Sequence, residues 1–140
     1  MHTMQYRRFG RTALQMPVFS CGGMRYQQSW QTIPESEIEA DNQSNLEYTI
    51  HQAVALGINH IETARGYGSS ELQLGKVLPR FPRQDLIVQT KIIPSDDPEK
   101  VRQSFEQSFG FLNLEYVDLL GLHGINTPEI LEWCMRPGGC

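Results

Sequence analysis

The 140-residue chain lacks any apolar run that approaches the roughly 18 residues needed to cross a bilayer. It also lacks an excess of positive charge, because 16 Asp and Glu outnumber 12 Lys and Arg and the net charge is −4. Nucleic acids and anionic membranes attract basic surfaces. The polar N-terminus lacks the apolar centre of a signal peptide. We therefore expect a cytoplasmic protein with neither a membrane nor a nucleic-acid partner.

Cysteine is scarce, and its spacing indicates neither disulfides nor metal binding. Cys21, Cys134 and Cys140 are odd in number and unpaired in spacing, which is typical of reduced thiols in a cytosol-like compartment. Neither CxxC nor HExxH occurs, so we expect no metal site. The GxSxG turn of acyl-transferring hydrolases is also missing. These absences argue against disulfide, metal and acyl-transfer chemistry, but they do not indicate which chemistry the protein performs.

The composition is that of a folded domain, with 39% hydrophobic and 20% charged residues. Two short stretches within Gln5–Pro17 predict a hairpin, and the apolar run Val18–Cys21 predicts the first buried strand. The polar, aperiodic segment Gln27–Asn42 predicts a long loop. Ser44 and Glu47 have the spacing of a capping box, so we expect the first helix to begin there.

Beyond that helix, apolar runs and helical periods alternate along the chain. Strands are predicted at 58–64, 86–93 and 116–122, and helices begin at Ser69 or Ser70, at Asp97-Pro98 and at Thr127-Pro128. This alternation favours a parallel α/β sheet, either doubly wound and open or closed as a barrel of βα units. A complete (β/α)8 TIM-type barrel takes about 250 residues. A hairpin plus four βα units, the fourth helix incomplete, would make residues 1–140 about half of one.

Polar side chains stand at the carboxyl ends of three predicted strands. Glu62, Lys91 and His123 occupy these positions, and Tyr67 lies in the turn after the first of them. His60 shares a strand face with Glu62 one layer below, and we assign it to packing. Enzymes built on parallel βα units keep their sites at the carboxyl ends of the strands. The four residues Glu62, Tyr67, Lys91 and His123 are therefore expected to converge.

Such a cluster suits proton transfer to a developing oxygen anion. A free tyrosine hydroxyl has a pKa of about 10, and a nearby ammonium lowers it toward the range useful for catalysis. Glu62 would keep Lys91 charged, while His123 would hydrogen-bond the substrate oxygen or share the proton with Tyr67. Carbonyl reduction by hydride needs this equipment.

The turn Gly66-Tyr67-Gly68 invites comparison with the dinucleotide-binding GxGxxG motif. The position of the third glycine holds Glu71, however. An acidic residue at a helix start repels phosphate, so we do not interpret this turn as a nucleotide-binding loop.

Four segments of the chain resemble the aldo-keto reductase family. Residues Gly57–Glu71 resemble its signature, in which an acidic residue lies five positions before the catalytic tyrosine. Gln89–Lys91 resembles the strand of the catalytic lysine, and Tyr116–His123 the strand of the histidine. The opening Tyr6–Thr12 resembles the start of bacterial members. These segments follow one another in the order of the family.

The resemblance implies a (β/α)8 barrel and NADPH-dependent reduction of an aldehyde or ketone, a small-molecule carbonyl substrate. It implies that Tyr67 is the general acid, Lys91 and Glu62 its tuning pair, and His123 the substrate-orienting residue. The family usually has Asp where this chain has Glu62. Residues that bind the cofactor are expected beyond Cys140. The substrate, the choice of NADPH over NADH, and any iron–sulfur module after the barrel are not specified by these residues.

A non-catalytic alternative stays open: a truncated fragment, or a binding module derived from a barrel. Half a barrel leaves its first and fourth strands as unpaired edges, and unpaired edges promote association. We therefore expect the isolated chain to bind NADPH negligibly and to self-associate.

Overall fold

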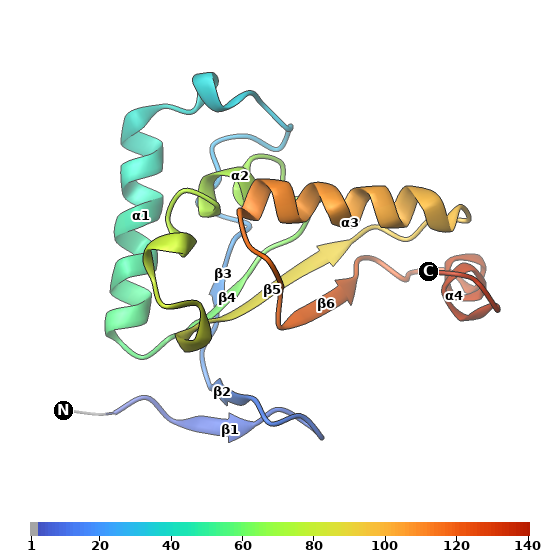
Figure 1. Ribbon diagram of the computed structural model, residues 1–140, viewed down its shortest axis with the longest axis horizontal. Coiled ribbons are helices and arrows are strands. Elements are labelled where there is room, and N and C mark those ends of the chain that lie inside the picture. The colour runs from blue at the N-terminus through green and yellow to red at the C-terminus, as the bar shows by residue number, and fades with distance from the viewer. Residues whose placement is uncertain (1–2) are drawn as a thin grey trace.

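The computed structural model describes residues 3–140 as an N-terminal hairpin followed by four parallel strands with helices between them (Figure 1). The hairpin pairs β1 (Tyr6–Arg8) with β2 (Gln15–Pro17), as predicted. The parallel sheet has the order β3-β4-β5-β6. Its strands are β3 (Cys21–Gly22), β4 (His60–Glu62), β5 (Ile87–Ile92) and β6 (Leu119–Leu122).

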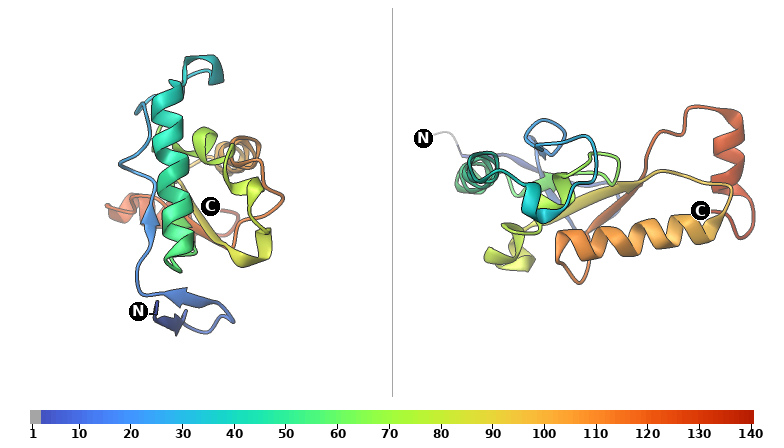
Figure 2. Two further views of the ribbon diagram at one scale, coloured as in Figure 1. Left: turned by 90° about the vertical axis from the view of Figure 1, so that its left-hand side faces the viewer. Right: turned by 90° about the horizontal axis from the view of Figure 1, so that it is seen from above.

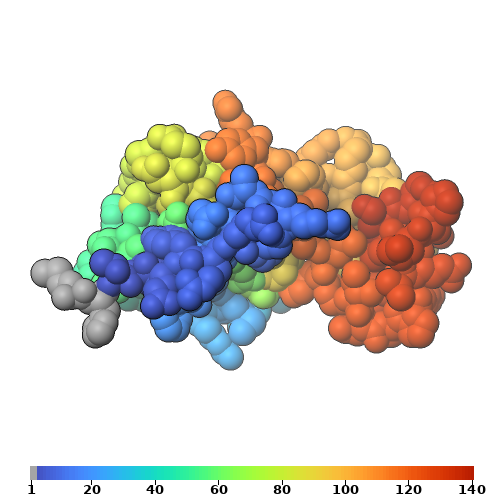
Figure 3. Space-filling view, turned by 90° about the horizontal axis from the view of Figure 1, so that it is seen from below, coloured from blue at the N-terminus to red at the C-terminus, as the bar shows by residue number. Residues whose placement is uncertain are grey.

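The hairpin lies at the amino ends of the parallel strands. The Tyr6 hydroxyl donates a hydrogen bond of 2.7 Å to the carbonyl of Gly57, just ahead of β4. Figure 3 shows the hairpin across this face, with the C-terminal segment off to one side. The carboxyl ends of the strands therefore stay free of it.

The strand order selects the barrel over the doubly wound sheet. Consecutive strands are neighbours throughout, whereas a doubly wound sheet reverses its order at a switch point. The connecting helices are α1 (Ala40–Ala55), α2 (Ser70–Leu74) and α3 (Pro98–Leu112), and α2 packs against both of the others (Figure 2). One continuous helical layer on one side of a parallel sheet is the arrangement of a (β/α)8 barrel. The chain forms about half of such a barrel.

The hydrophobic core lies between the sheet and this helical layer. Its largest members come from α1, β4, the α2 region, β5 and the end of α3: Leu46, Ile50, Ile61, Leu74, Val77, Leu78, Val88 and Leu112. Burying each such side chain contributes about 1.5–3 kcal/mol. Three short 3-10 helices, Glu35–Glu37, Leu78–Arg80 and Arg83–Asp85, complete the connections. Among the residues described, no helix combines the length and apolar character needed to cross a membrane.

The predicted first strand is misplaced by three residues. Val18 and Phe19 are 50% and 66% exposed, and the strand begins only at Cys21. Pro17 ends the hairpin and is buried, while Val18 donates its amide hydrogen to Gln5 of the hairpin. The apolar run therefore belongs to the hairpin side of the molecule, and the prediction of a buried strand over Val18–Cys21 was wrong.

The first helix begins earlier than predicted, at Ala40 instead of Ser44. Its N-cap residue Glu39 makes no side-chain capping bond. Side chains of the first turn instead bond to α2: Gln43 donates to the Gln73 carbonyl, and Gln73 donates to Asn42 at 2.7 Å. Tertiary hydrogen bonds replace the local cap, which shortens the predicted loop.

Three predicted helix starts are confirmed, since α2 begins at Ser70 and the other two have side-chain caps. The Asp97 carboxylate accepts a hydrogen bond from the Glu99 amide, and the Thr127 hydroxyl accepts one from the Ile130 amide. Thr127 thereby starts α4 (Pro128–Met135), which lies beyond the carboxyl end of β6 (Figure 1). In α3, the rings of Phe105 and Phe109 meet edge to face, with centroids 4.6 Å apart.

Candidate active site

The fold brings the four predicted site residues to one end of the sheet. Glu62 is the last residue of β4, and Lys91 lies near the end of β5. His123 directly follows β6, and Tyr67 lies in the turn between β4 and α2. Because parallel register sets Glu62 opposite Gln89 and Lys91 opposite Gly121, these strands end at nearly the same level.

An ion pair between Lys91 and Glu62 forms the base of the cluster. The ammonium contacts the Glu62 carboxylate and donates a hydrogen bond of 3.0 Å to the carbonyl of Thr63. The two side chains are 16% and 23% exposed. Burial lowers the pKa of Lys91, while the neighbouring carboxylate favours its charged form. The longer glutamate side chain thus still reaches the lysine.

Tyr67 lies between the lysine and the histidine. The Lys91 nitrogen is 4.7 Å from the centroid of the Tyr67 ring. The His123 ring stands perpendicular to the tyrosine ring, with centroids 5.4 Å apart. Within residues 3–140, no hydrogen bond joins the Tyr67 hydroxyl to Lys91. The ammonium contacts the ring face, and the hydroxyl is left available to another partner.

The surroundings of His123 favour the neutral form of its imidazole. Burial lowers its pKa, and the positive charge of Lys91 lowers it further. Its Nδ1 atom is buried and has no hydrogen-bond partner in the described part of the chain. This nitrogen lies against the turn before Tyr67, since a Cβ atom at Gly66 would be 3.5 Å from it, and an unsatisfied buried polar atom is unfavourable.

Gly121 makes room for the lysine side chain. A Cβ atom built at this position would lie 2.9 Å from Cγ of Lys91, closer than ordinary contacts. Any larger residue at position 121 would push the Lys91 side chain away from the Tyr67 ring. The glycine of this strand is therefore part of the site geometry, a role that the sequence did not reveal.

A tryptophan from the long loop also contacts the cluster. Trp30 stands edge-on to Tyr67, with ring centroids 6.4 Å apart, and is 57% exposed. The loop approaches closely because Gly68 has a φ of +57° and its missing Cβ would meet the Ser29 carbonyl at 2.0 Å. Trp30 was not among the predicted site residues, although an aromatic residue in a long polar loop was a usable signal.

One layer below, His60 is buried and hydrogen-bonded, which agrees with a packing role. Its Nδ1 bonds to the Ser20 hydroxyl at 2.7 Å and its Nε2 to Gln89 Oε1 at 3.2 Å. Because that amide oxygen only accepts, Nε2 carries the proton. Burial lowers the pKa of His60 as well.

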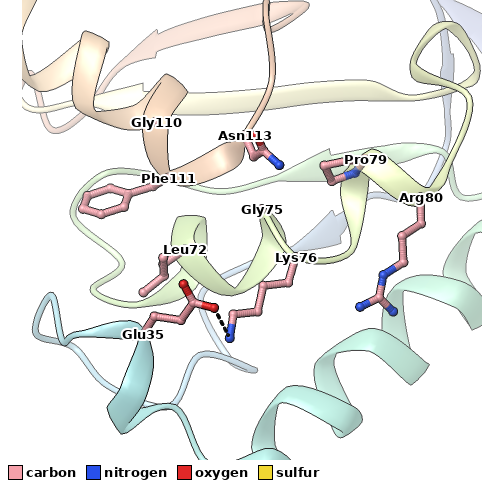
Figure 4. Close-up of a pocket in the computed structure, with 9 residues that line it drawn as sticks. All are labelled: Glu35, Leu72, Gly75, Lys76, Pro79, Arg80, Gly110, Phe111 and Asn113. Atoms are coloured by element: carbon pink, nitrogen blue, oxygen red, sulfur yellow. Dashed lines mark ion pairs between the residues drawn. The ribbon is translucent and has the colours of Figure 1, made fainter.

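A pocket of about 490 Å³ lies elsewhere, among the outer helices (Figure 4). Its two basic residues are already paired, Lys76 with Glu35 at 3.1 Å and Arg80 with Glu47 at 2.6 Å. In the part of the chain that the structure covers, no three His, Cys, Asp or Glu side chains gather as a metal site would require. The candidate active site is therefore the cluster at the strand ends and not this pocket.

The sequential parallel strands define a partial (β/α)8 barrel, with tyrosine, lysine and histidine near their carboxyl ends. Residues 19–134 match the sequence model of the Aldo/keto reductase family, and the chain belongs to that family. The chain is 32% identical to L-galactose dehydrogenase of Arabidopsis thaliana, covering 89% of this chain and 40% of that protein.

Solved structures agree with the fold. A Pseudomonas aeruginosa protein assigned to the aldo-keto reductases superposes with a TM-score of 0.74 at 27% identity, covering 93% of this chain and 52% of that one. An aldo-keto reductase from Klebsiella pneumoniae in complex with NADPH gives a TM-score of 0.70 at 18% identity, covering 95% and 46%. The chain thus spans about half the length of the proteins that it matches.

Proposed function

We propose that the protein containing this chain reduces an aldehyde or ketone to an alcohol with a nicotinamide cofactor, and that Tyr67 is the general acid. One observation carries the proposal: the Tyr67 ring contacts the Lys91 ammonium on one side and the His123 imidazole on another. A positive charge and a hydrogen-bonding group beside a phenol suit transfer of its proton to a carbonyl oxygen.

Each residue around Tyr67 has a proposed role in this proton transfer. Lys91, held by Glu62 and the Thr63 carbonyl, stabilises negative charge on the phenolic oxygen as the proton leaves. The neutral His123 orients the carbonyl oxygen by hydrogen bonding. A nicotinamide cofactor, when bound, would supply hydride for the carbonyl carbon. Trp30, edge-on to Tyr67, forms one wall of the substrate pocket.

The cofactor is proposed to be NADPH. The family match and the NADPH complex of the Klebsiella pneumoniae structure support this choice. The residues that hold the phosphate-bearing part of the cofactor are proposed to lie beyond Cys140. Comparing NADPH with NADH at equal concentrations tests the cofactor choice directly.

The central test is the Tyr67→Phe variant of the full-length protein, assayed by NADPH oxidation with an aldehyde substrate. Removing the acid is expected to lower kcat/KM by about 10² to 10⁴, the usual contribution of general acid catalysis. Tyr48→Phe, an exposed tyrosine on α1, serves as the matched control and should leave activity unchanged. Retained activity in Tyr67→Phe would remove Tyr67 from its role.

A second proposal concerns the 140-residue chain by itself, as a non-catalytic, self-associating module. Within the residues described, β3 and β6 each pair on one side only. Leu120 and Leu122 of β6 are 51% and 37% exposed. Such edges promote pairing with another chain. Sedimentation of the purified chain should give dimers or larger species and titration should give negligible NADPH binding; a monomer with micromolar affinity would refute both expectations.

A further inference from the structure

A buried ion pair lies directly behind the turn that carries Tyr67. Arg65 precedes the tyrosine by two residues, and Glu71 follows it by four; the guanidinium and carboxylate contact each other. Their side chains are 11% and 0% exposed. Two charges buried in this way need further hydrogen bonds to offset their desolvation. The partners in those hydrogen bonds indicate the role of the ion pair.

The guanidinium binds three other segments of the chain. It donates to the carbonyl of Gly68 at 3.2 Å and to the hydroxyl of Thr32 in the long loop at 2.8 Å. It also stacks 4.5 Å from the centroid of the Phe111 ring in α3. Since Arg65 and Gly68 flank Tyr67, one planar group closes the turn around the tyrosine and joins it to the loop and the helix layer.

The carboxylate extends the network to the strand that carries the lysine. Glu71 accepts a hydrogen bond of 2.6 Å from the hydroxyl of Thr90, which is 0% exposed. Thr90 directly precedes Lys91 in β5. The main chain adds a parallel link, because the Arg65 amide donates to the Lys91 carbonyl at 2.9 Å. The network therefore connects the turn of the phenol to the strand of the ammonium.

We propose that Arg65 is a positioning residue for Tyr67, acting through Glu71 and Thr90. The network holds the Tyr67 ring at a fixed place against Lys91 and His123. Arg65 itself touches none of the reacting atoms in this arrangement. The proposal rests on the proposed reductase function, in which the placement of the phenol sets the rate of proton transfer. A shift of about 1 Å in such a group can lower a rate about 100-fold.

Arg65→Lys is the sharpest variant, made in the full-length protein. Lysine keeps a positive charge beside Glu71, so the buried carboxylate is not left unpaired. A single ammonium lacks the planar fork that reaches Glu71, Gly68 and Thr32 together. We expect kcat to fall about 10-fold with KM within about 2-fold. The solvent isotope effect on kcat should rise, because a misplaced phenol makes proton transfer the slower step.

Arg80→Lys is the matched control. Arg80 pairs with Glu47 at 2.6 Å on the outer surface and is remote from Tyr67. The same substitution there is expected to leave kcat and the isotope effect unchanged. A second variant, Thr90→Val, removes the donor to Glu71 and should change kcat in the same direction by a smaller factor. A fall in kcat that Arg80→Lys shares, or that merely follows a lower Tm, would overturn the proposal.

A crystal structure of Arg65→Lys separates this inference from the reductase proposal. The distance from the Lys91 nitrogen to the Tyr67 ring centroid, 4.7 Å here, should lengthen, or the ring should become disordered. An unchanged ring with unchanged kcat overturns the positioning role. If the unmodified protein reduces no carbonyl, the proposed function fails, and the position of the ring alone then decides whether Arg65 places Tyr67.

Discussion

The strand ends and the outer helices both carry ion pairs, and the two sets differ in burial. Arg65–Glu71 and Lys91–Glu62 lie among strand ends and turns, with exposures between 0% and 23%. On α3, Arg102 pairs with Glu99 and Glu106, and all three side chains are more than half exposed. An exposed ion pair adds little stability, because water would solvate its two charges almost as well. A buried ion pair fixes the position of its side chains. Ion pairs of similar residue types therefore position side chains at the strand ends, whereas on α3 they remain solvated.

The largest difference between the regions should appear when the site lysine is removed. Lys91→Met deletes the ammonium that stabilises a phenolate, so kcat/KM is expected to fall about 100-fold or more. Lys100→Met, an exposed lysine on α3, should keep the activity of the unmodified protein. Steady-state NADPH oxidation by both variants makes the measurement, and equal activities would erase the proposed distinction between the regions.

The two regions can also be compared by adding one methyl group to a glycine in each of them. Gly121→Ala places a Cβ atom 2.9 Å from Lys91 Cγ, so we expect the lysine to shift and kcat to fall about 10-fold. Gly110→Ala, on α3, meets nothing within 4 Å and should stabilise the helix by about 0.5–1 kcal/mol. Kinetics and urea unfolding of both variants test this, and full activity in Gly121→Ala would contradict it.

Two histidines, His60 below the site and His123 within it, should make stability depend on pH. Burial lowers the pKa of His60 and His123 in the folded chain. The unfolded chain therefore binds more protons as the pH falls through about 6.5, and the free energy of unfolding should decrease in that direction. Urea unfolding between pH 7.5 and 5.5 measures the slope. His60→Gln should flatten it, whereas the exposed His51→Gln should not; equal slopes would argue against burial as the cause.

The smallest effect is expected from the exposed ion pairs. Arg102→Met removes both contacts on α3, and we expect no measurable change in Tm or kcat because water and salt screen these charges. Thermal melting at low and high salt is the measurement. A clear loss of stability at physiological salt would mean that exposure does not separate the two sets of ion pairs.

Local patterns in the sequence were enough to predict the alternation of elements and the residues at the strand ends. Strand β5 opens on the apolar residues Ile87 and Val88, and Asp97 and Thr127 cap their helices through bonds to nearby amides. Such features depend on neighbours within a few residues. The four site residues followed because parallel strands bring their carboxyl ends together, although their catalytic roles stay predictions.

Features that depend on distant contacts could not be predicted. The start of α1 rests on bonds from its first turn to α2, which overrode the capping box at Ser44. The approach of Trp30 to Tyr67 depends on a loop packing over Gly68. The function of Glu71 was judged only by its effect on phosphate, because its partners Arg65 and Thr90 become visible only in three dimensions.

Glu62, Tyr67, Lys91 and His123 all come from consecutive strand–helix units, between β4 and the residue after β6. The residues proposed for acid–base chemistry therefore lie within one contiguous segment of the chain, residues 62–123. Transfer of that segment to another chain would carry all four side chains together.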